Sequence, residues 1–269
     1  MDREDILSQY AKEEERILVA KVLDKRKAVI QTNKIINTDF LDEQEQKIVQ
    51  NVVNKIKEKN YLFFGGKQEA ERKMLLFYPE KLTDVIQENS WEKSSIVKVI
   101  RITLPIELEG QYTHRDYLSA MRKLGVKREK IGDIIVNKEG ADILVTKEIA
   151  EYMLINLKEL TRFQKSKIEE IEVEQIREAE VKIEELRITV SSLRLDNIVA
   201  ELAHTSRNRA NEILLQERVF VNGAMEKKST KIIKEADRVT IRGKGRFVIA
   251  KIEGNTKKGK FIVKVHHPI

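Results

Sequence analysis

The sequence predicts an α+β protein with a mostly helical N-terminal segment, a central β-α-β-β-α-β segment and a basic C-terminal segment that ends in a hairpin extension. Three observations predict it. Apolar residues recur at helical spacing before residue 60, β-branched runs alternate with helical patterns between residues 96 and 173, and positive charge is concentrated after residue 187. At 269 residues and 41% hydrophobic content the chain can form two or three small cores.

The N-terminal segment is predicted to be an α-rich domain over residues 1–92. A long helix is expected from the apolar residues Ile6, Leu7, Tyr10, Ile17, Leu18 and Val22, and a second from Ile48, Val49, Val52, Val53 and Ile56. Asp42, with Glu45 three residues later, predicts a capping box at the start of that second helix. The run YLFFGGKQEAERKMLLFYPE then indicates two short strands around Gly65-Gly66, with room for a helical piece between them.

The central segment, residues 93–175, is predicted to have the ferredoxin-like split topology that RNA-recognition modules also use. The expected order is strand 96–104, helix 114–124, strands 131–136 and 142–145, helix 147–157 and strand 167–173. Base-stacking sheets carry aromatic residues on their two central strands, and neither IVKVIRI nor DILV contains one. A scaffolding role is therefore favoured for this sheet.

Residues 176–190 are predicted to be a solvated connector. This glutamate-rich stretch is compatible with a helix, a pair of strands or a linker, and its spacing does not decide between them.

The C-terminal segment carries the positive charge of the chain. Residues 187–269 contain 18 Lys and Arg against 8 Asp and Glu, a net charge of +10, whereas residues 1–186 contain 33 against 36, a net charge of −3. A basic segment attached to a slightly acidic body is typical of a module that binds a polyanion.

The basic segment, residues 191–269, is predicted to begin with two short amphipathic helices. Ser206 is suited to cap the second of them, which places Arg207 and Arg209 in its first turn, where a helix binds phosphate. Asn222-Gly223 predicts a tight hairpin, and the glycines of RGKGR at 242–246 allow a backbone to approach a ligand closely. The candidate RNA-binding residues are Arg194, Ser206, Arg207, Arg209, Lys227, Lys228, Arg242, Lys244, Arg246, Lys257, Lys258 and Lys260.

Several classes of protein are disfavoured. The chain has no cysteine and four histidines without metal-ligand spacing, so we expect no disulfide, metal or cofactor. The polar N-terminus and strand-sized apolar runs predict a cytoplasmic protein without a membrane segment. No catalytic residues are predicted, because no glycine-rich cofactor loop and no catalytic constellation are present. DNA reading by a helix-turn-helix is disfavoured because the cations cluster at the start of the second helix instead of along it.

Two resemblances extend this reading. RLD at 194–196, Ser206-Arg207, VFVNG at 219–223 and Asp237 resemble the S-four domain, the RNA-binding fold named after ribosomal protein S-four. FFGGKQEAER at 63–72, HRDYLSAMRKLGVKREKIGDIIV at 114–136, SSLRLD at 191–196, RGKGRF at 242–247 and GNTKKGK at 254–260 resemble the bacterial YlmH family over nearly the whole chain.

The YlmH resemblance implies a non-enzymatic protein that binds rRNA and tRNA on the large ribosomal subunit, with stalled peptidyl-tRNA in ribosome-associated quality control. It also implies a link to cell division, through neighbouring genes, and a second functional patch made of His114, Arg115, Lys127, Arg128 and Lys130, with Asp133. A protein partner for residues 1–92 is compatible with this function. The alternatives are an RNA-binding accessory or a diverged relative of an enzyme that modifies rRNA or tRNA, and an interaction protein linked to cell division.

Overall fold

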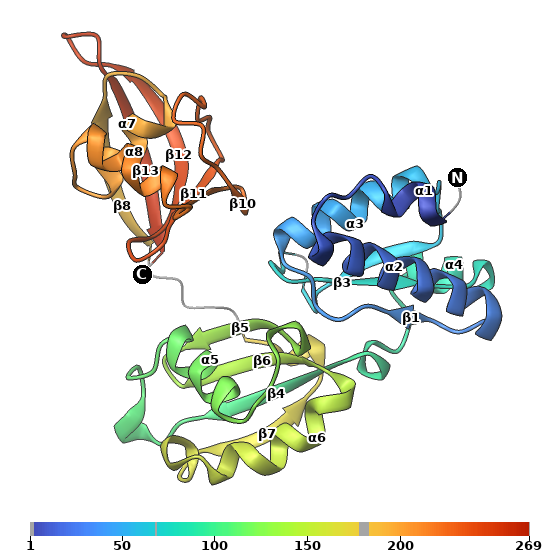
Figure 1. The fold of residues 1–269 in the computed structure, drawn as a ribbon. Helices are drawn as coiled ribbons and strands as arrows, with labels where there is room; N and C mark the ends of the chain where they lie inside the picture. The colour runs from blue at the N-terminus through green and yellow to red at the C-terminus, as the bar shows by residue number, and fades with distance from the viewer. Residues whose placement is uncertain (1–2, 68, 178–182, 269) are drawn as a thin grey trace. The chain divides into compact units, whose positions relative to one another are not determined.

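The computed structural model describes residues 3–67, 69–177 and 183–268. The chain divides into two compact units, Met1–Glu180 and Val181–Ile269 (Figure 1). Helices and antiparallel sheets occur in both, as the α+β prediction requires. Among the helices of the described residues, none is long and apolar enough to cross a membrane.

The first part of unit 1 packs helices on a small sheet. Its elements are α1 (Arg3–Leu7), α2 (Glu13–Thr32), β1 (Ile36–Asn37), α3 (Glu43–Lys55), β2 (Tyr61–Phe64), β3 (Met74–Phe77) and α4 (Thr83–Gln87), with sheet order β1-β3-β2. The capping box is confirmed: the Glu45 amide donates to Asp42 Oδ1 at 2.9 Å, and the Asp42 amide donates to Glu45 Oε2 at 2.7 Å. The two strands around Gly65-Gly66 are also confirmed, and the described residues between them form no helix.

The single long helix predicted near the N-terminus is wrong, since two helices form there. Side chains of Ser8 and Gln9 both donate to the carbonyl of Asp5, at 3.1 and 2.9 Å, and such bonds compete with helix continuation. The chain turns before α2 begins, and Ile6 and Val19 both reach one buried core with α3.

The second part of unit 1 has the predicted β-α-β-β-α-β order. It comprises β4 (Val97–Thr103), α5 (His114–Lys123), β5 (Ile131–Asn137), β6 (Gly140–Thr146), α6 (Lys147–Asn156) and β7 (Lys167–Ile171). The antiparallel sheet order β5-β6-β4-β7 is that of the ferredoxin-like motif. Both helices pack on one face, where Ile100, Ile143 and Tyr117 are buried together.

The other face of this sheet is covered by the N-terminal sheet. Val99 and Leu144 share a buried cluster with Phe40 and Leu76. Gly66, at φ +86°, lies so close to Leu144 that an added Cβ would be 2.0 Å from Leu144 Cδ2. Because the two parts of unit 1 share this core, the predicted division at residues 92/93 stays a proposal. Short 3-10 helices occupy connections at Glu80–Leu82, Lys93–Ser95, Ile106–Leu108, Arg128–Lys130, Leu157–Glu159, Thr161–Phe163 and Val173–Gln175.

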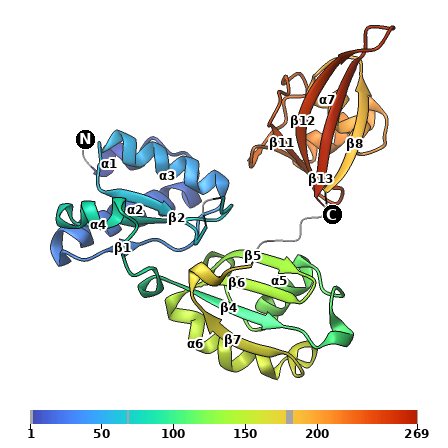
Figure 2. The ribbon, with the colours of Figure 1, turned by 180° about the vertical axis from the view of Figure 1, so that it is seen from behind.

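Unit 2 packs two helices on a six-stranded sheet (Figures 1 and 2). Its elements are β8 (Ile183–Val190), α7 (Leu195–Leu202), α8 (Arg207–Leu215), β9 (Val219–Val221), β10 (Ala224–Met225), β11 (Arg238–Ile241), β12 (Gly245–Asn255) and β13 (Phe261–Pro268), in the sheet order β10-β9-β11-β12-β13-β8. The hairpin turn is confirmed, with positive φ at Asn222 and Gly223.

The predicted connector 176–190 needs correction. Residues 183–190 are strand β8, which pairs with β13 along its whole length. Glu185, on the outward side, pairs with Lys264 at 2.7 Å, while Ile188 and Val190 face the core. Residues 178–182 of the connector lie outside the described residues.

Candidate nucleic-acid interface

A buried carboxylate organises two of the predicted arginines. Asp196, in the first turn of α7, has a side chain only 1% exposed. It accepts from Nε and Nη2 of Arg194 at 3.2 and 2.9 Å, and from Nε and Nη2 of Arg207 at 3.0 and 2.8 Å. It also accepts from the amide of Asn197 at 2.9 Å. Burial by itself raises the pKa of Asp196, but the arginine hydrogen bonds outweigh it and hold that pKa below its usual value.

This arrangement fixes the direction of two cations without cancelling their charge. Two guanidinium groups on one carboxylate leave a formal charge of +1, and each guanidinium gives Asp196 only two of its five N–H groups. The pair of Asp196 with Arg194 joins residues two positions apart in the sequence. The second pair, with Arg207 eleven residues away, has no signal in local spacing, because it depends on how α7 and α8 pack.

The start of α8 has the predicted cap. Ser206 Oγ accepts from the amide of Arg209 at 3.2 Å. Arg207 and Arg209 lie in the first turn but point to different partners, the former to Asp196 and the latter to Glu212. The positive end of the helix dipole therefore lies beside two arginine side chains, which favours an anion there.

A basic cavity opens beside Arg209. It has a volume of about 280 Å³ and is lined by Ala203, His204, Thr205, Arg209, Ile213, Arg218, Ile241, Arg242 and Lys244. These residues come from the turn between α7 and α8, from α8, from the connection between α8 and β9, and from the end of β11 with the turn that follows it. No carboxylate belongs to this lining in the described chain. The cavity thus combines a helix N-terminus with four arginine and lysine side chains, a suitable site for phosphate groups.

Two hydrogen bonds link Arg218 and Arg242, which both line the cavity. The Arg242 amide donates to the Arg218 carbonyl at 2.9 Å, and Arg218 Nη2 donates to the Arg242 carbonyl at 2.8 Å. The Arg242 guanidinium lies over the Phe220 ring at 4.8 Å. Arg218 and His204 have no signal in the sequence that predicts their place in the cavity, because neither lies in a glycine-rich or helix-capping pattern.

The remaining predicted residues of unit 2 lie outside this cavity. Lys227 forms an ion pair with Glu217 at 2.6 Å, and the amide of Lys228 donates to Glu226. Arg246 is on β12, opposite Thr240. Lys257, Lys258 and Lys260 are at the far end of β12, an 11-residue strand that places them about 30 Å from the cavity.

The second patch is split by the structure. His114 and Arg115 begin α5, whereas Lys127, Arg128 and Lys130 follow its end. A ten-residue helix separates the two groups by about 15 Å. His114, Arg115 and Lys127 are exposed, and the other two are half-buried.

Contacts of Lys130 and Asp133 connect the central sheet with the N-terminal part of unit 1. Arg128 Nη1 donates to the Ile131 carbonyl at 2.6 Å, and burial lowers the pKa of Arg128 to about 10. Lys130 pairs with Asp39 at 2.6 Å. Asp133 accepts from the amides of residues 71 and 72 at 2.9 and 3.0 Å. These contacts give Arg128, Lys130 and Asp133 partners within unit 1.

The covered face of the central sheet contains a buried ion-pair network. Asp142, fully buried on β6, accepts from Arg101 Nε and Nη2 at 2.8 Å each. The amide of Arg177 donates to the same carboxylate at 2.8 Å. This network and the N-terminal sheet occupy the face on which an RNA-recognition module stacks bases, in agreement with its lack of aromatic residues.

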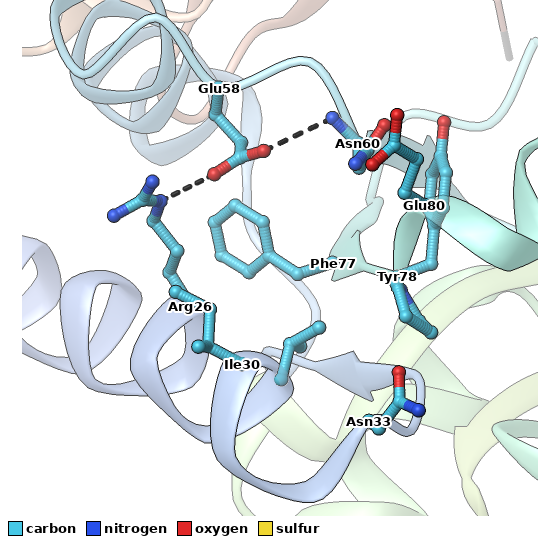
Figure 3. Close-up of a pocket in the computed structure, with 10 residues that line it drawn as sticks. Arg26, Ile30, Asn33, Glu58, Asn60, Phe77, Tyr78 and Glu80 are labelled. Carbon is cyan, nitrogen blue, oxygen red and sulfur yellow. Dashed lines mark hydrogen bonds and ion pairs between the residues drawn. The ribbon is translucent and has the colours of Figure 1, made fainter.

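A second cavity lies in unit 1 (Figure 3). Its volume is about 200 Å³, and its lining residues are Arg26, Val29, Ile30, Asn33, Glu58, Asn60, Phe77, Tyr78, Pro79 and Glu80. Arg26 pairs with Glu58 at its rim, and the exposed Ile30 extends from α2. In the part of the chain that the structure describes, no cluster of His, Asp and Glu could hold a metal ion.

The chain is similar to known proteins over most of its length. A family model described as "Putative RNA-binding domain in YlmH" matches residues 94–190. A Bacillus subtilis (strain 168) protein named "Ribosome-associated protein quality control protein P2" is 30% identical over 256 residues, which are 95% of this chain and 96% of that protein. The structure of "Cell division protein ylmH from Streptococcus pneumoniae" aligns with a TM-score of 0.48 and 18% identity, over 62% of this chain and 98% of that one.

The family match bears on the central segment. Its description attaches RNA binding to residues 94–190, the region for which the sequence favoured a scaffolding role. The match also extends through β8, which the structure places in the sheet of unit 2.

Proposed function

Because the chain belongs to the YlmH family, we propose that it is a non-enzymatic RNA-binding protein that acts on the large ribosomal subunit, with stalled peptidyl-tRNA, in ribosome-associated quality control. The printed name of the Bacillus subtilis relative, which is similar over nearly the whole chain, supports the ribosomal part of this proposal. A cytoplasmic location follows from that function.

The observation that carries the proposal is the basic cavity of unit 2. Arg209, Arg242 and Lys244 converge on a space with no acidic lining residue among those described, beside a capped helix N-terminus. Arg194 and Arg207 are held nearby in α7 and α8 by Asp196. Such a surface recognises phosphate positions and therefore the shape of rRNA or tRNA more than a base sequence. It supports the S-four assignment of residues 191–269, which remains a proposal.

Unit 1 contributes in a different way. Since its central sheet face is covered, any RNA contact made by residues 94–190 must use another surface, such as the exposed start of α5 at His114 and Arg115. The cavity beside Ile30, which is 70% exposed, is the candidate contact for a protein partner of the N-terminal part.

The test is co-sedimentation with purified large ribosomal subunits across a range of salt concentrations, with and without bound peptidyl-tRNA. The variant Arg207→Ala/Arg209→Ala removes two cations from α8. The matched control is Lys21→Ala/Lys27→Ala, which removes two exposed cations from α2. We expect the α8 variant to bind more weakly and to flatten the logarithmic salt slope by roughly 1 for each lost phosphate contact.

The control should bind like the wild type. Equal loss in both variants would mean that net charge, and not the interface, determines binding. Failure of the wild-type protein to bind subunits, together with tight binding to a free RNA, would favour the alternative of an accessory to RNA modification.

A further inference from the structure

The hairpin tip, residues Thr256–Lys260 between β12 and β13, is the other concentrated positive surface of unit 2. It projects beyond the helices of the unit in both views (Figures 1 and 2). Three of its five residues are the exposed lysines Lys257, Lys258 and Lys260.

The charge of the tip is not neutralised by an ion pair with any residue that the structure describes. In the described residues, none of the three lysine side chains has an ion pair. Other cations of unit 2 do: Lys227 pairs with Glu217, Lys231 with Glu226 and Lys264 with Glu185. The carboxylate of Glu253, the last acidic residue before the tip, is taken by Arg187 at 3.0 Å.

The tip is nevertheless an ordered turn. The amide of Thr256 donates to the Lys260 carbonyl at 2.7 Å, and the Lys260 amide donates to Thr256 Oγ1 at 3.1 Å. Gly254 and Gly259 have φ of +112° and +75°, which only glycine adopts readily. The three cations are therefore presented on a fixed support, which lowers the entropy lost on binding.

Core formation explains the length of β13, which pairs with β8 as far as Phe261 and buries Val263, but it does not explain the exposed outer part of β12. Pairing of β12 with β11 ends at Val248, and beyond Ile249 the strand pairs only with β13. Outward from Lys251 its side chains are exposed or half-exposed and do not belong to the buried core. The outer part of β12 buries little apolar surface, so hydrophobic stabilisation does not account for the lysine-rich turn at its end.

We propose that the hairpin tip is a second polyanion contact of unit 2, which binds an RNA phosphate backbone about 30 Å from the one held at the basic cavity. This inference rests on the proposed function. The separation is set by β12, whose start adjoins Lys244 in the cavity and whose end adjoins the tip. An RNA that binds the cavity and the tip together must have phosphates about 30 Å apart, either roughly one turn apart on one helix or on two neighbouring segments.

The absence of cysteine from the natural sequence allows a direct test. A single cysteine at Asn255→Cys, beside the tip, or at Asn208→Cys, in the first turn of α8, can carry an iron chelate that cleaves nearby RNA by hydroxyl radicals. Both positions are exposed. Each labelled protein is bound to purified large ribosomal subunits, and cleavage positions in the rRNA are mapped.

We expect both probes to cleave rRNA at different nucleotides. If the two probes cleave separate rRNA segments, the cavity and the tip bind different segments. If they cleave positions about one helical turn apart in one helix, both contacts bind the same duplex. Cleavage from position 208 with none from position 255 overturns the inference and leaves the proposed function standing. Cleavage from neither position contradicts the proposed function itself.

A binding measurement gives an independent check. The variant Lys257→Ala/Lys258→Ala/Lys260→Ala should flatten the logarithmic salt slope of subunit binding by roughly 1 to 3. The control Lys21→Ala/Lys27→Ala/Lys34→Ala removes the same charge from exposed positions of unit 1 and should leave the slope unchanged. A tip variant with the wild-type slope and affinity overturns the inference.

Discussion

Replacement of Asp196 by alanine separates two accounts of the interface. If only charge matters, removing the carboxylate raises the local formal charge from +1 to +2 and should tighten RNA binding. If orientation matters, Arg194 and Arg207 lose the group that holds them and must be ordered by the RNA itself. We expect orientation to prevail, because ordering an arginine side chain costs up to about 2 kcal/mol.

The expected magnitudes follow from the exposure of the groups. Losing about 1 to 2 kcal/mol of preorganisation corresponds to roughly 5- to 30-fold weaker RNA binding. Stability should fall by about 2 kcal/mol, less than the roughly 3–5 kcal/mol of a fully buried broken pair, because the side chains of Arg194 and Arg207 are 33% and 51% exposed. The Asn197 amide also loses its acceptor.

Two measurements on the full chain check this prediction. Co-sedimentation with large subunits gives the change in affinity. Urea unfolding gives the stability, because the fluorescence of Trp91 reports unit 1 alone while circular dichroism reports both units. Glu201→Ala, which removes one exposed negative charge from α7, is the charge-matched control. Tighter RNA binding by the Asp196→Ala protein than by this control would refute the reasoning.

Three further predictions concern the stability of unit 1, and each is measured by urea unfolding followed through Trp91 fluorescence. Gly66→Ala should destabilise it by about 2 kcal/mol or more, since φ is +86° and the new Cβ meets Leu144; an unchanged transition would contradict this close approach. Asp142→Ala should cost about 3–5 kcal/mol. Burial raises the pKa of Asp142, but the hydrogen bonds from arginines outweigh burial, and the resulting pKa is below its usual value. The stabilisation by the Asp142 carboxylate is therefore present at neutral pH and is lost as pH falls through that lowered pKa. Equal acid sensitivity of the wild type and the Asp142→Ala variant would refute this. Asp42→Ala should cost about 1 kcal/mol, and no loss would mean that the capping box is not stabilising.

Local patterns were sufficient for much of the fold. The capping box at Asp42, the hairpin at Asn222-Gly223 and the cap at Ser206 each depend on residues within three or four positions of one another. The alternation of strands and helices in the central segment likewise predicted its order of elements. These features are encoded by short-range hydrogen bonds and periodicity, which a single sequence displays directly.

The missed features depend on contacts between distant segments. The glutamates of strand β8 predict a solvated connector, and only its pairing with β13 shows that the segment is a strand. The bond of Arg207 to Asp196 and the place of Arg218 in the cavity depend on helix and strand packing. The separation of the second patch into two groups also follows from the fold, since α5 lies between them, and the role of these residues stays a prediction.

The pairing of β8 with β13 has a consequence for synthesis of the chain. Val190 pairs with Phe261 and Ile183 with Pro268, so each residue of β8 finds its partner 71 to 85 positions later. At synthesis rates of about 5–20 residues per second, β8 waits several seconds for that partner. During this interval it is an unpaired strand, and its charged outer side, with Glu185 and Arg187, disfavours pairing with other chains. The same charges that make β8 look like a solvated connector in the sequence thus disfavour aggregation of the nascent chain until β13 pairs with it.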